Sequence, residues 1–202
     1  MFCCIQFVWA ADDWELWLGN TVKVKVNDRV NLNFLEEFRM HEDMSKFYTY
    51  VLYVGPSFNI NRYLDTAIWY KLVESKSEGH WEDTHRYDID FTLKYDLNGF
   101  KLSNRSRFEN NVTKASWLYR DRMKIAKDFK ILDKKYTPYI SNEFFLNMNP
   151  NDGYSENRAS IGISTAFILD TKLTLYYMSR AKKKDGNWEN ANILGTFIGL
   201  SF

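Results

Sequence analysis

The last segment of the chain alternates so regularly between two kinds of side chain that it constrains the local structure strongly. The two sides are Leu194, Thr196, Ile198, Leu200 and Phe202 against Gly195, Phe197, Gly199 and Ser201. A period of two residues is typical of a β-strand, whose successive side chains point to opposite faces. The sequence therefore predicts a terminal strand with one large, mainly apolar face and one face of mostly small residues.

The same alternation recurs along the chain, and no window of useful length shows the stripe of an amphipathic helix. Two long strands are expected on either side of Asn27–Arg29. Further strands are expected at about 47–58, 62–73, 85–97, 100–110, 116–126, 138–148, 157–168, 172–181 and 189–202. The count is about eleven, but bacterial single-chain barrels have even numbers of strands. We therefore expect about ten to twelve, with an error near Gly19–Asn20 or within residues 127–137.

An alternating strand that ends on an aromatic residue is typical of the last strand of a bacterial outer-membrane β-barrel. Ile198, Leu200 and Phe202 would then form the C-terminal signal that the outer-membrane assembly machinery reads. No run of about 18 apolar residues is present, which excludes a helical membrane protein, whereas a barrel keeps a low mean hydropathy because half of each strand faces a polar lumen. The predicted fold is all-β: a single antiparallel up-and-down transmembrane barrel.

Residues 1–12 differ from the rest of the chain. They are apolar up to the small residues Ala10 and Ala11, like the back half of a signal peptide, although the charged front is missing. A frayed hydrophobic N-terminus is the alternative. Residues 13–202 contain no Gly/Ser/Pro-rich linker and are expected to form one barrel domain. The net charge of +1, with basic and acidic residues interleaved, gives no basic field for nucleic acid.

The clearest local signal is Asn98–Gly99, which lies between two alternating segments. This dipeptide favours a two-residue type I′ hairpin turn, because both central residues need a positive φ. The turn fixes the register, so that Asp90 lies opposite Arg107 on one face and Ile89 lies opposite Phe108 on the other. A slip of one residue would invert every face, so turn and alternation support each other.

The connections are expected to alternate in length, as in outer-membrane barrels with short periplasmic turns and longer external loops. The long segments are 41–46, 74–84, 110–115, 149–156 and 181–188, and the short ones are 27–29, 59–61, 98–99 and the region near 170. Residues 127–137 are the exception, because they are too long for a tight periplasmic turn.

If the apolar face meets lipid, the other face carries many charges at strand centres as well as at strand ends. They are Glu37, Arg39, Arg86, Asp88, Asp90, Lys94, Arg105, Arg107, Glu109, Arg120, Arg122, Lys124, Glu143 and Arg158. In a narrow lumen such charges need partners or water, and arginine suits this place because its planar fork pairs with two carboxylate oxygens. We expect an interior ladder of carboxylates and guanidinium groups, which either cross-links the barrel or lines a path for a small polar solute.

Several short motifs carry a resemblance to a known family. They are Asn104-Arg105-Ser106-Arg107-Phe108-Glu109, Tyr119-Arg120-Asp121-Arg122, Pro138-Tyr139-Ile140-Ser141-Asn142-Glu143, and Asn157-Arg158 with Gly162. With them the chain resembles domain of unknown function 2490 (DUF2490), an uncharacterised bacterial outer-membrane β-barrel family. Trp14, Trp17 and the Glu37-Phe38-Arg39 step resemble its N-terminal strands. The resemblance implies an exported barrel without an assigned activity and adds no catalytic residue.

Catalytic and metal-binding chemistry has weak support in the sequence. His41, His80 and His85 lie in or beside expected loops, and no two of them have the spacing of a metal site. An outer-membrane acyl hydrolase would need a serine beside a histidine, and His85 with Ser103 or Ser106 is the only nearby choice. The hairpin register places His85 far along the strand from Ser103. We therefore expect neither an enzyme nor a bound cofactor or metal.

The aromatic residues are expected to form girdles at the two membrane interfaces, rather than ordinary core packing. They are Trp17, Tyr53, Trp69, Tyr70, Trp81, Trp117, Tyr119, Tyr176, Tyr177 and Trp188. The function expected is therefore structural or a narrow passive pore, with membrane lipid and the assembly machinery as partners. The alternative from another class is a soluble lipocalin-like barrel whose apolar face surrounds a lipid or another apolar ligand.

Overall fold

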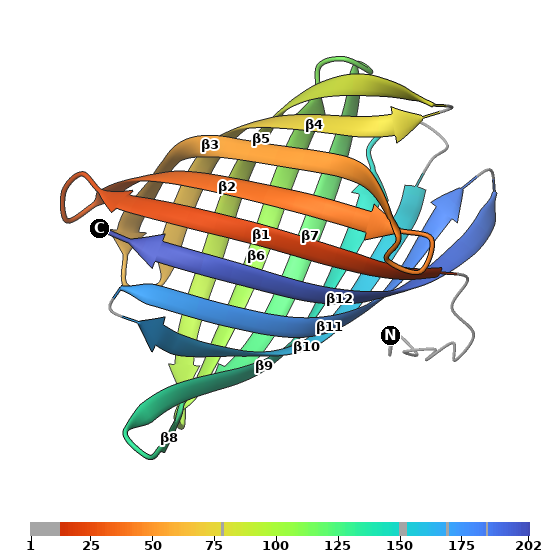
Figure 1. The fold of residues 1–202 in the computed structure, drawn as a ribbon. Helices are drawn as coiled ribbons and strands as arrows, with labels where there is room; N and C mark the ends of the chain where they lie inside the picture. Colours follow the sequence, from red (N-terminus) through yellow and green to blue (C-terminus); the bar gives the residue numbers. More distant parts are fainter. Residues whose placement is uncertain (1–12, 78, 150–152, 169, 185) are drawn as a thin grey trace.

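The computed structural model describes residues 13–77, 79–149, 153–168, 170–184 and 186–202, and the regular elements within them are all β-strands (Figure 1). The strands are β1 (Asp13–Lys25), β2 (Val30–His41), β3 (Lys46–Asn61), β4 (Leu64–Ser77), β5 (His80–Leu97), β6 (Phe100–Asn111), β7 (Ser116–Lys127), β8 (Phe129–Ile131), β9 (Lys134–Asn147), β10 (Gly153–Ile168), β11 (Thr171–Lys184) and β12 (Asn187–Ser201). The signal-like segment 1–12 lies outside the described residues. Each strand predicted from the sequence is present, and most extend farther than predicted.

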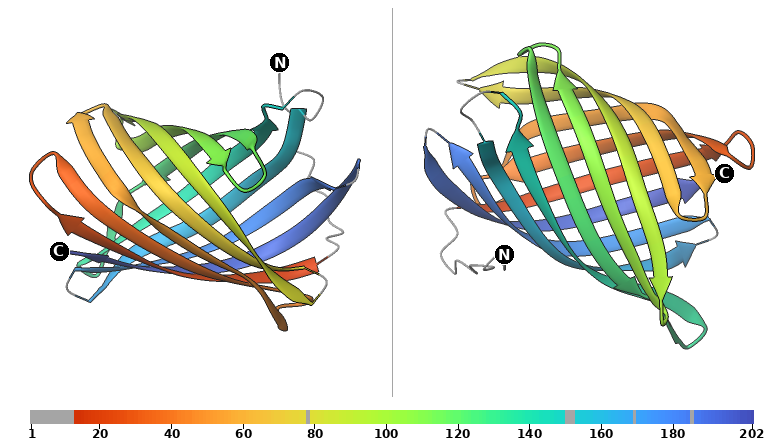
Figure 2. Two further views of the ribbon diagram at one scale, coloured as in Figure 1. Left: turned by 90° about the horizontal axis from the view of Figure 1, so that it is seen from above. Right: turned by 180° about the vertical axis from the view of Figure 1, so that it is seen from behind.

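Eleven of these strands close into one barrel, in which each pairs with two neighbours and β12 returns to β1. The views in Figures 1 and 2 show the strands of one wall crossing those of the opposite wall at an angle, as the tilt of barrel strands requires. The pairing between β1 and β12 is parallel, from Asp13 opposite Ala191 to Lys23 opposite Ser201. The predicted all-β barrel of about ten to twelve strands is confirmed, whereas the expected even number and wholly antiparallel pairing are corrected by this closure. An odd number makes the first and last strands run in the same direction.

The strand outside the closed wall, β8, explains the long connection at residues 127–137. It pairs only with β9, in the same register in which β7 pairs with β9. Asp128 separates the two segments, close to Pro138, which has no N–H for the ladder. Thus β7 and β8 form one interrupted strand, and the β8–β9 hairpin projects beyond the wall (Figure 1).

The turns are short at both ends of the barrel. Asn98 and Gly99 have φ values of 51° and 80°, and the register of β5 and β6 is the predicted one, with Asp90 opposite Arg107. The long external loops are not observed, because β4 runs to Ser77 and β5 starts at His80, while β11 runs to Lys184. Residues expected in loops instead lengthen the strands, so both mouths of the barrel are rimmed mainly by strand ends.

Glycines on the inward face let aromatic rings approach the wall. A Cβ atom at Gly195 would lie 1.9 Å from the ring of Tyr176, and one at Gly19 would lie 2.2 Å from the ring of Phe197. Aromatic rings therefore occupy the space beside these two glycines.

Candidate functional site: the charged lumen

The charges inside the barrel take their positions from the registers of β5, β6 and β7. These registers place Asp88 opposite Glu109, Arg107 opposite Arg120, and Arg105 opposite Arg122. Like charges directly opposite each other destabilise a sheet. A charge that faces a like charge must find a further counter-charge elsewhere, as Arg107 does in Asp90, which lies opposite it on β5.

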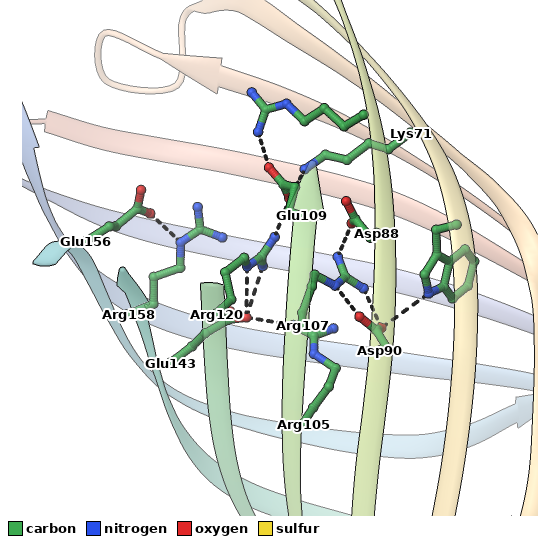
Figure 3. Close-up of polar contacts among 12 residues, drawn as sticks. Lys71, Asp88, Asp90, Arg105, Arg107, Glu109, Arg120, Glu143, Glu156 and Arg158 are labelled. Atoms are coloured by element: carbon green, nitrogen blue, oxygen red, sulfur yellow. Dashed lines mark hydrogen bonds and ion pairs between the residues drawn. The ribbon is translucent and has the colours of Figure 1, made fainter. Parts of the chain in front are cut away.

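Arg107 lies between two carboxylates of β5 (Figure 3). Its Nε and Nη2 donate to the two oxygens of Asp90 at 2.6 and 2.7 Å, and its Nη1 lies 2.9 Å from Asp88 Oδ2. Trp69 donates its indole N–H to Asp90 at 3.2 Å. Asp88 is 0% exposed and neither of its oxygens accepts a hydrogen bond from the described residues. Arg107 is therefore its direct counter-charge.

Glu109 is the second centre and is 1% exposed. Its carboxylate accepts from Lys71 Nζ at 2.9 Å, from Arg86 Nη1, and from Arg120 Nη1 at 3.4 Å. Four strands contribute to this centre, since Lys71 lies on β4, Arg86 on β5, Glu109 on β6 and Arg120 on β7. Three cations around one carboxylate leave a local excess of positive charge.

Glu143 of β9 links the next strands. It accepts from Arg105 Nη2 at 2.6 Å and from Arg120 Nη2 at 3.0 Å (Figure 3). The guanidinium of Arg120 also lies 4.6 Å from the ring centroid of Phe145, and that of Arg158 lies 4.5 Å from the same ring. Phe145 thus separates two cations and attracts both through its ring face.

The chain of contacts continues across the parallel closure of the barrel. Trp17 of β1 is 2% exposed and lies under Arg39, at 3.9 Å from ring centroid to guanidinium carbon, and near Arg158 at 5.1 Å. Its indole N–H donates to Glu15 at 2.8 Å, and Arg180 of β11 donates to the same carboxylate at 2.7 Å. The belt of charges and rings therefore surrounds the lumen at mid-height.

Three cavities follow one another through the barrel. A chamber of about 1040 Å³ lies at the end of the β2–β3 turn, one of about 750 Å³ lies at the end that holds Ser201, and one of about 420 Å³ lies between them. The first and the middle cavity share the lining residues Arg39, Tyr53, Arg120 and Arg158. The middle and last share Arg122, Lys124 and Lys172. Basic side chains thus line both junctions between successive cavities.

A separate ion cluster lies at the rim beside the interruption of β7. Asp128 accepts from Lys101 at 2.6 Å and from Thr137 at 2.8 Å, and Lys135 lies 2.7 Å away. Hydrogen bonds from Lys101 and Lys135 hold the pKa of Asp128 well below its usual range, and the same carboxylate raises the pKa of Lys135. This cluster joins β6 to the projecting β8–β9 hairpin.

The structure places the charged residues expected on the inward face as follows. Glu37, Arg39, Asp88, Asp90, Arg105, Arg107, Glu109, Arg120, Glu143 and Arg158 lie in the lumen and have counter-charges there, whereas Arg122 lies in the lumen and makes no ion pair with a described residue. The sequence did not reveal Glu15, Lys71, Glu156 and Arg180. Lys71 follows two aromatic residues on a strand without a turn that fixes its faces, and Glu15 meets Arg180 only because β1 closes beside β12.

The expected girdles need a correction. Trp17, Tyr53, Trp69 and Tyr176 point into the lumen, where they line the middle cavity. Trp81, Trp117 and Trp188 do lie on the outside and are about half exposed. Ile198, Leu200 and Phe202 share the outward face of β12 and its end.

The histidine and serines considered for hydrolysis do not meet. His85 Nδ1 lies 2.7 Å from the hydroxyl of Tyr70 on the outer face. Ser106 donates to Asp121 on that face at 2.8 Å, and Ser103 lines the chamber of about 750 Å³. Among the described residues, no group of three or more His, Cys, Asp or Glu is placed to hold a metal ion. No helix in the described part of the chain is long and apolar enough to cross a membrane.

Comparison with known proteins identifies a family and no activity. Residues 14–191 match the model of a family described as protein of unknown function, DUF2490. A search of curated proteins finds no match.

Proposed function

The chain belongs to the DUF2490 family, and from the geometry of its barrel we propose that it is an integral protein of the bacterial outer membrane whose lumen is a narrow passive pore for small polar solutes. One observation carries the proposal: most charged side chains at the strand centres point inside the barrel, and most large aliphatic side chains point outside. A soluble barrel around an apolar ligand would need the opposite arrangement. Membrane lipid and the barrel-assembly machinery are the partners that this proposal implies.

The outer surface supports contact with lipid. Ile161 is 58% exposed, Leu93 57% and Ile140 54%, and exposed aliphatic or aromatic residues recur on most strands. Soluble monomers rarely expose contiguous apolar patches of more than a few hundred Å². Every strand of the closed wall also exceeds the roughly 9–11 residues that a tilted strand needs to cross a bilayer.

Aromatic side chains gather outside the two ends of the barrel. Trp81, Trp117 and Trp188 lie near one end, and Phe100 and Phe202 near the other. Rings at these two levels match the interfacial girdles of membrane barrels. The outward Trp81 also packs against Phe47, with ring centroids 5.5 Å apart.

Among the described residues, two carboxylates lie on the outer face near the middle of a strand, Glu36 on β2, to which Tyr50 donates at 3.4 Å, and Asp121 on β7. The oxygens of Asp121 accept from Asn104 at 2.6 Å, Ser106 at 2.8 Å and Tyr119 at 2.9 Å, and the residue is 7% exposed. A carboxylate at this depth is costly unless its hydrogen-bonding capacity is met. Two donors from the adjacent strand β6 and one from β7 itself meet it here.

The lumen supports a narrow passage. The cavity of about 1040 Å³ and the middle cavity of about 420 Å³ meet at Arg39, Tyr53, Arg120 and Arg158. The ring of Trp17 lies against two of these guanidinium groups, those of Arg39 and Arg158. A lining of this kind selects by charge as well as by size, as rings of charged side chains do in other pores.

Membrane insertion is tested by fractionation of cells that express the full chain. We expect the protein in the outer-membrane fraction, extractable only with detergent, and heat-modifiable migration on a denaturing gel. A protein that remains in the aqueous phase without detergent would contradict the membrane proposal.

The pore is tested separately, by planar-bilayer recording on refolded protein. We expect a small conductance that increases in Trp17→Ala, because this change removes the ring that supports the narrow boundary. Trp188→Ala is the matched control, since it removes an outward ring of the same kind and should leave the conductance unchanged. Absence of conductance in both wild type and Trp17→Ala, in barrels shown to be folded by heat-modifiable migration, refutes the pore.

A further inference from the structure

The chamber at the Ser201 end contains an excess of positive charge. Its lining includes two acidic residues, Asp96 and Asp170, and six basic ones, Lys94, Lys101, Arg122, Lys124, Lys135 and Lys172. Three of them have carboxylate partners at the rim, where Lys94 pairs with Asp65 and both Lys101 and Lys135 pair with Asp128. Within the described residues, Arg122, Lys124 and Lys172 pair with no carboxylate, although they are close enough to repel one another electrostatically.

The sheet register makes this excess costly. Arg105 and Arg122 lie directly opposite each other on β6 and β7, facing the same lumen. Glu143 lies opposite Arg122 in the register of β7 and β9, but among the described residues its carboxylate is within ion-pair distance of Arg105, at 2.6 Å, and Arg120, at 3.0 Å, and not of Arg122. One row higher, Arg107 and Arg120 are also opposite each other, but both have carboxylate partners. Carboxylates therefore neutralise the arginines at mid-height, but not all of the cations that line the chamber at the Ser201 end.

Serine hydroxyl groups, which can donate hydrogen bonds, flank Lys124 in this chamber. Lys124 lies opposite Ser103 on β6 and opposite Ser141 on β9, so a serine flanks it on each side. Its ammonium lies 3.7 Å from the ring centroid of Tyr139 on the neighbouring strand β9, a contact that positions the side chain without neutralising its charge. Arg122 and Lys124 are partly buried and Lys172 is exposed, and cations without a counter-charge in their own protein gain from an anionic ligand.

We propose that Arg122, Lys124 and Lys172 form a binding site for a tetrahedral oxyanion, namely phosphate or the phosphate group of a small solute. A guanidinium and two ammonium groups supply charge-assisted hydrogen bonds to such an anion, and serine hydroxyls add neutral donors. The chamber of about 750 Å³ is large enough for a sugar phosphate as well as for the free ion. Binding itself is independent of membrane insertion, whereas its effect on conduction rests on the proposed pore.

Binding is tested by calorimetric titration of the refolded full chain with inorganic phosphate and, in a second arm, with a hexose phosphate. We expect saturable binding that weakens at least about tenfold in Lys124→Gln and in Arg122→Gln, the loss typical of one charge-assisted hydrogen bond. Stronger binding of the hexose phosphate would identify a phosphorylated solute as the ligand, and equal affinity would identify the free ion. Lys182→Gln is the matched control, because it removes the same charge from the opposite chamber.

Two results would overturn the site. One is the absence of saturable phosphate binding by the folded wild type, and the other is an equal loss of binding in Lys182→Gln and Lys124→Gln, which would indicate only the general field of the lumen. Comparing phosphate binding with conductance in planar bilayers separates this proposal from the pore. Phosphate binding without any conductance supports the site and refutes the pore, whereas conductance without phosphate binding does the reverse.

Discussion

Replacing Arg107 by methionine tests whether the interior charges hold the barrel together. Met keeps an unbranched apolar stem of similar reach but removes the charge and three close contacts with Asp88 and Asp90. Asp88 is 0% exposed and accepts no hydrogen bond from the described residues, so the variant leaves this carboxylate without a direct counter-charge. Asp90 would keep only the indole N–H of Trp69.

The expected cost follows from this burial. Breaking a buried ion pair by removing one partner destabilises a protein by about 3–5 kcal/mol, because the remaining charge is buried without compensation. Lys94→Met is the matched control, since Lys94 pairs with Asp65 at 2.7 Å but the two side chains are 41% and 30% exposed. An exposed pair is worth about 0–1 kcal/mol. We therefore expect the two variants to differ by about 3 kcal/mol.

The measurement is the free energy of unfolding in urea, with the barrel refolded in detergent micelles and its tryptophan fluorescence recorded. The triple variant Arg107→Met, Asp88→Asn, Asp90→Asn should recover most of the loss, because it removes the stranded charges as well. A cost below about 1 kcal/mol for Arg107→Met, or a cost equal to that of Lys94→Met, would refute the reasoning.

Three further changes probe packing, the rim and a turn. Gly195→Ala should cost about 1–3 kcal/mol of unfolding free energy, because the new Cβ would lie 1.9 Å from the ring of Tyr176, and the cost should be smaller in a Tyr176→Ala background. The lowered pKa of Asp128 means that its ion cluster with Lys135 stabilises the β8–β9 hairpin above the ordinary pKa of 3.8 and is lost as pH falls toward the lowered value. Pepsin should therefore cleave this hairpin faster as the pH falls below 3.8. In Asp128→Asn the rate of hairpin cleavage should no longer show this increase. Leu132 has a φ of 48° and is 93% exposed, so Leu132→Asn should stabilise the turn by about 1 kcal/mol, as measured by urea unfolding.

The part of the lumen that the sequence predicts best is the part that a local turn controls. Asn98–Gly99 requires positive φ at both residues, and this requirement alone sets the pairing of β5 with β6. The positions of Asp90 and Arg107 follow from it without any knowledge of the barrel. Their ion pair is therefore readable from about 18 residues of sequence.

Faces that lack such a turn are harder to assign. Trp17 and Trp69 alternate with other bulky residues, and alternation separates two faces without saying which of them is inside. The lumen accepts these rings because Trp17 can lie under guanidinium groups and Trp69 can donate to Asp90. A membrane girdle would satisfy the same side chains with interfacial water, so the sequence alone does not distinguish the two environments.

The parallel closure gives the inward glycines their explanation. Parallel pairing is slightly less stable per residue than antiparallel pairing, so the junction of β1 and β12 needs support from side chains. On the inward face of this junction, the ring of Phe197 covers Gly19 of the partner strand, and in the adjoining antiparallel pair the ring of Tyr176 on β11 covers Gly195 of β12. Rings packed on glycine bury backbone that would otherwise be open to the lumen, and they hold adjacent strands in one register. An odd number of strands is therefore compatible with a closed wall here because Phe197 packs on Gly19 at the parallel junction and Tyr176 packs on Gly195 beside it.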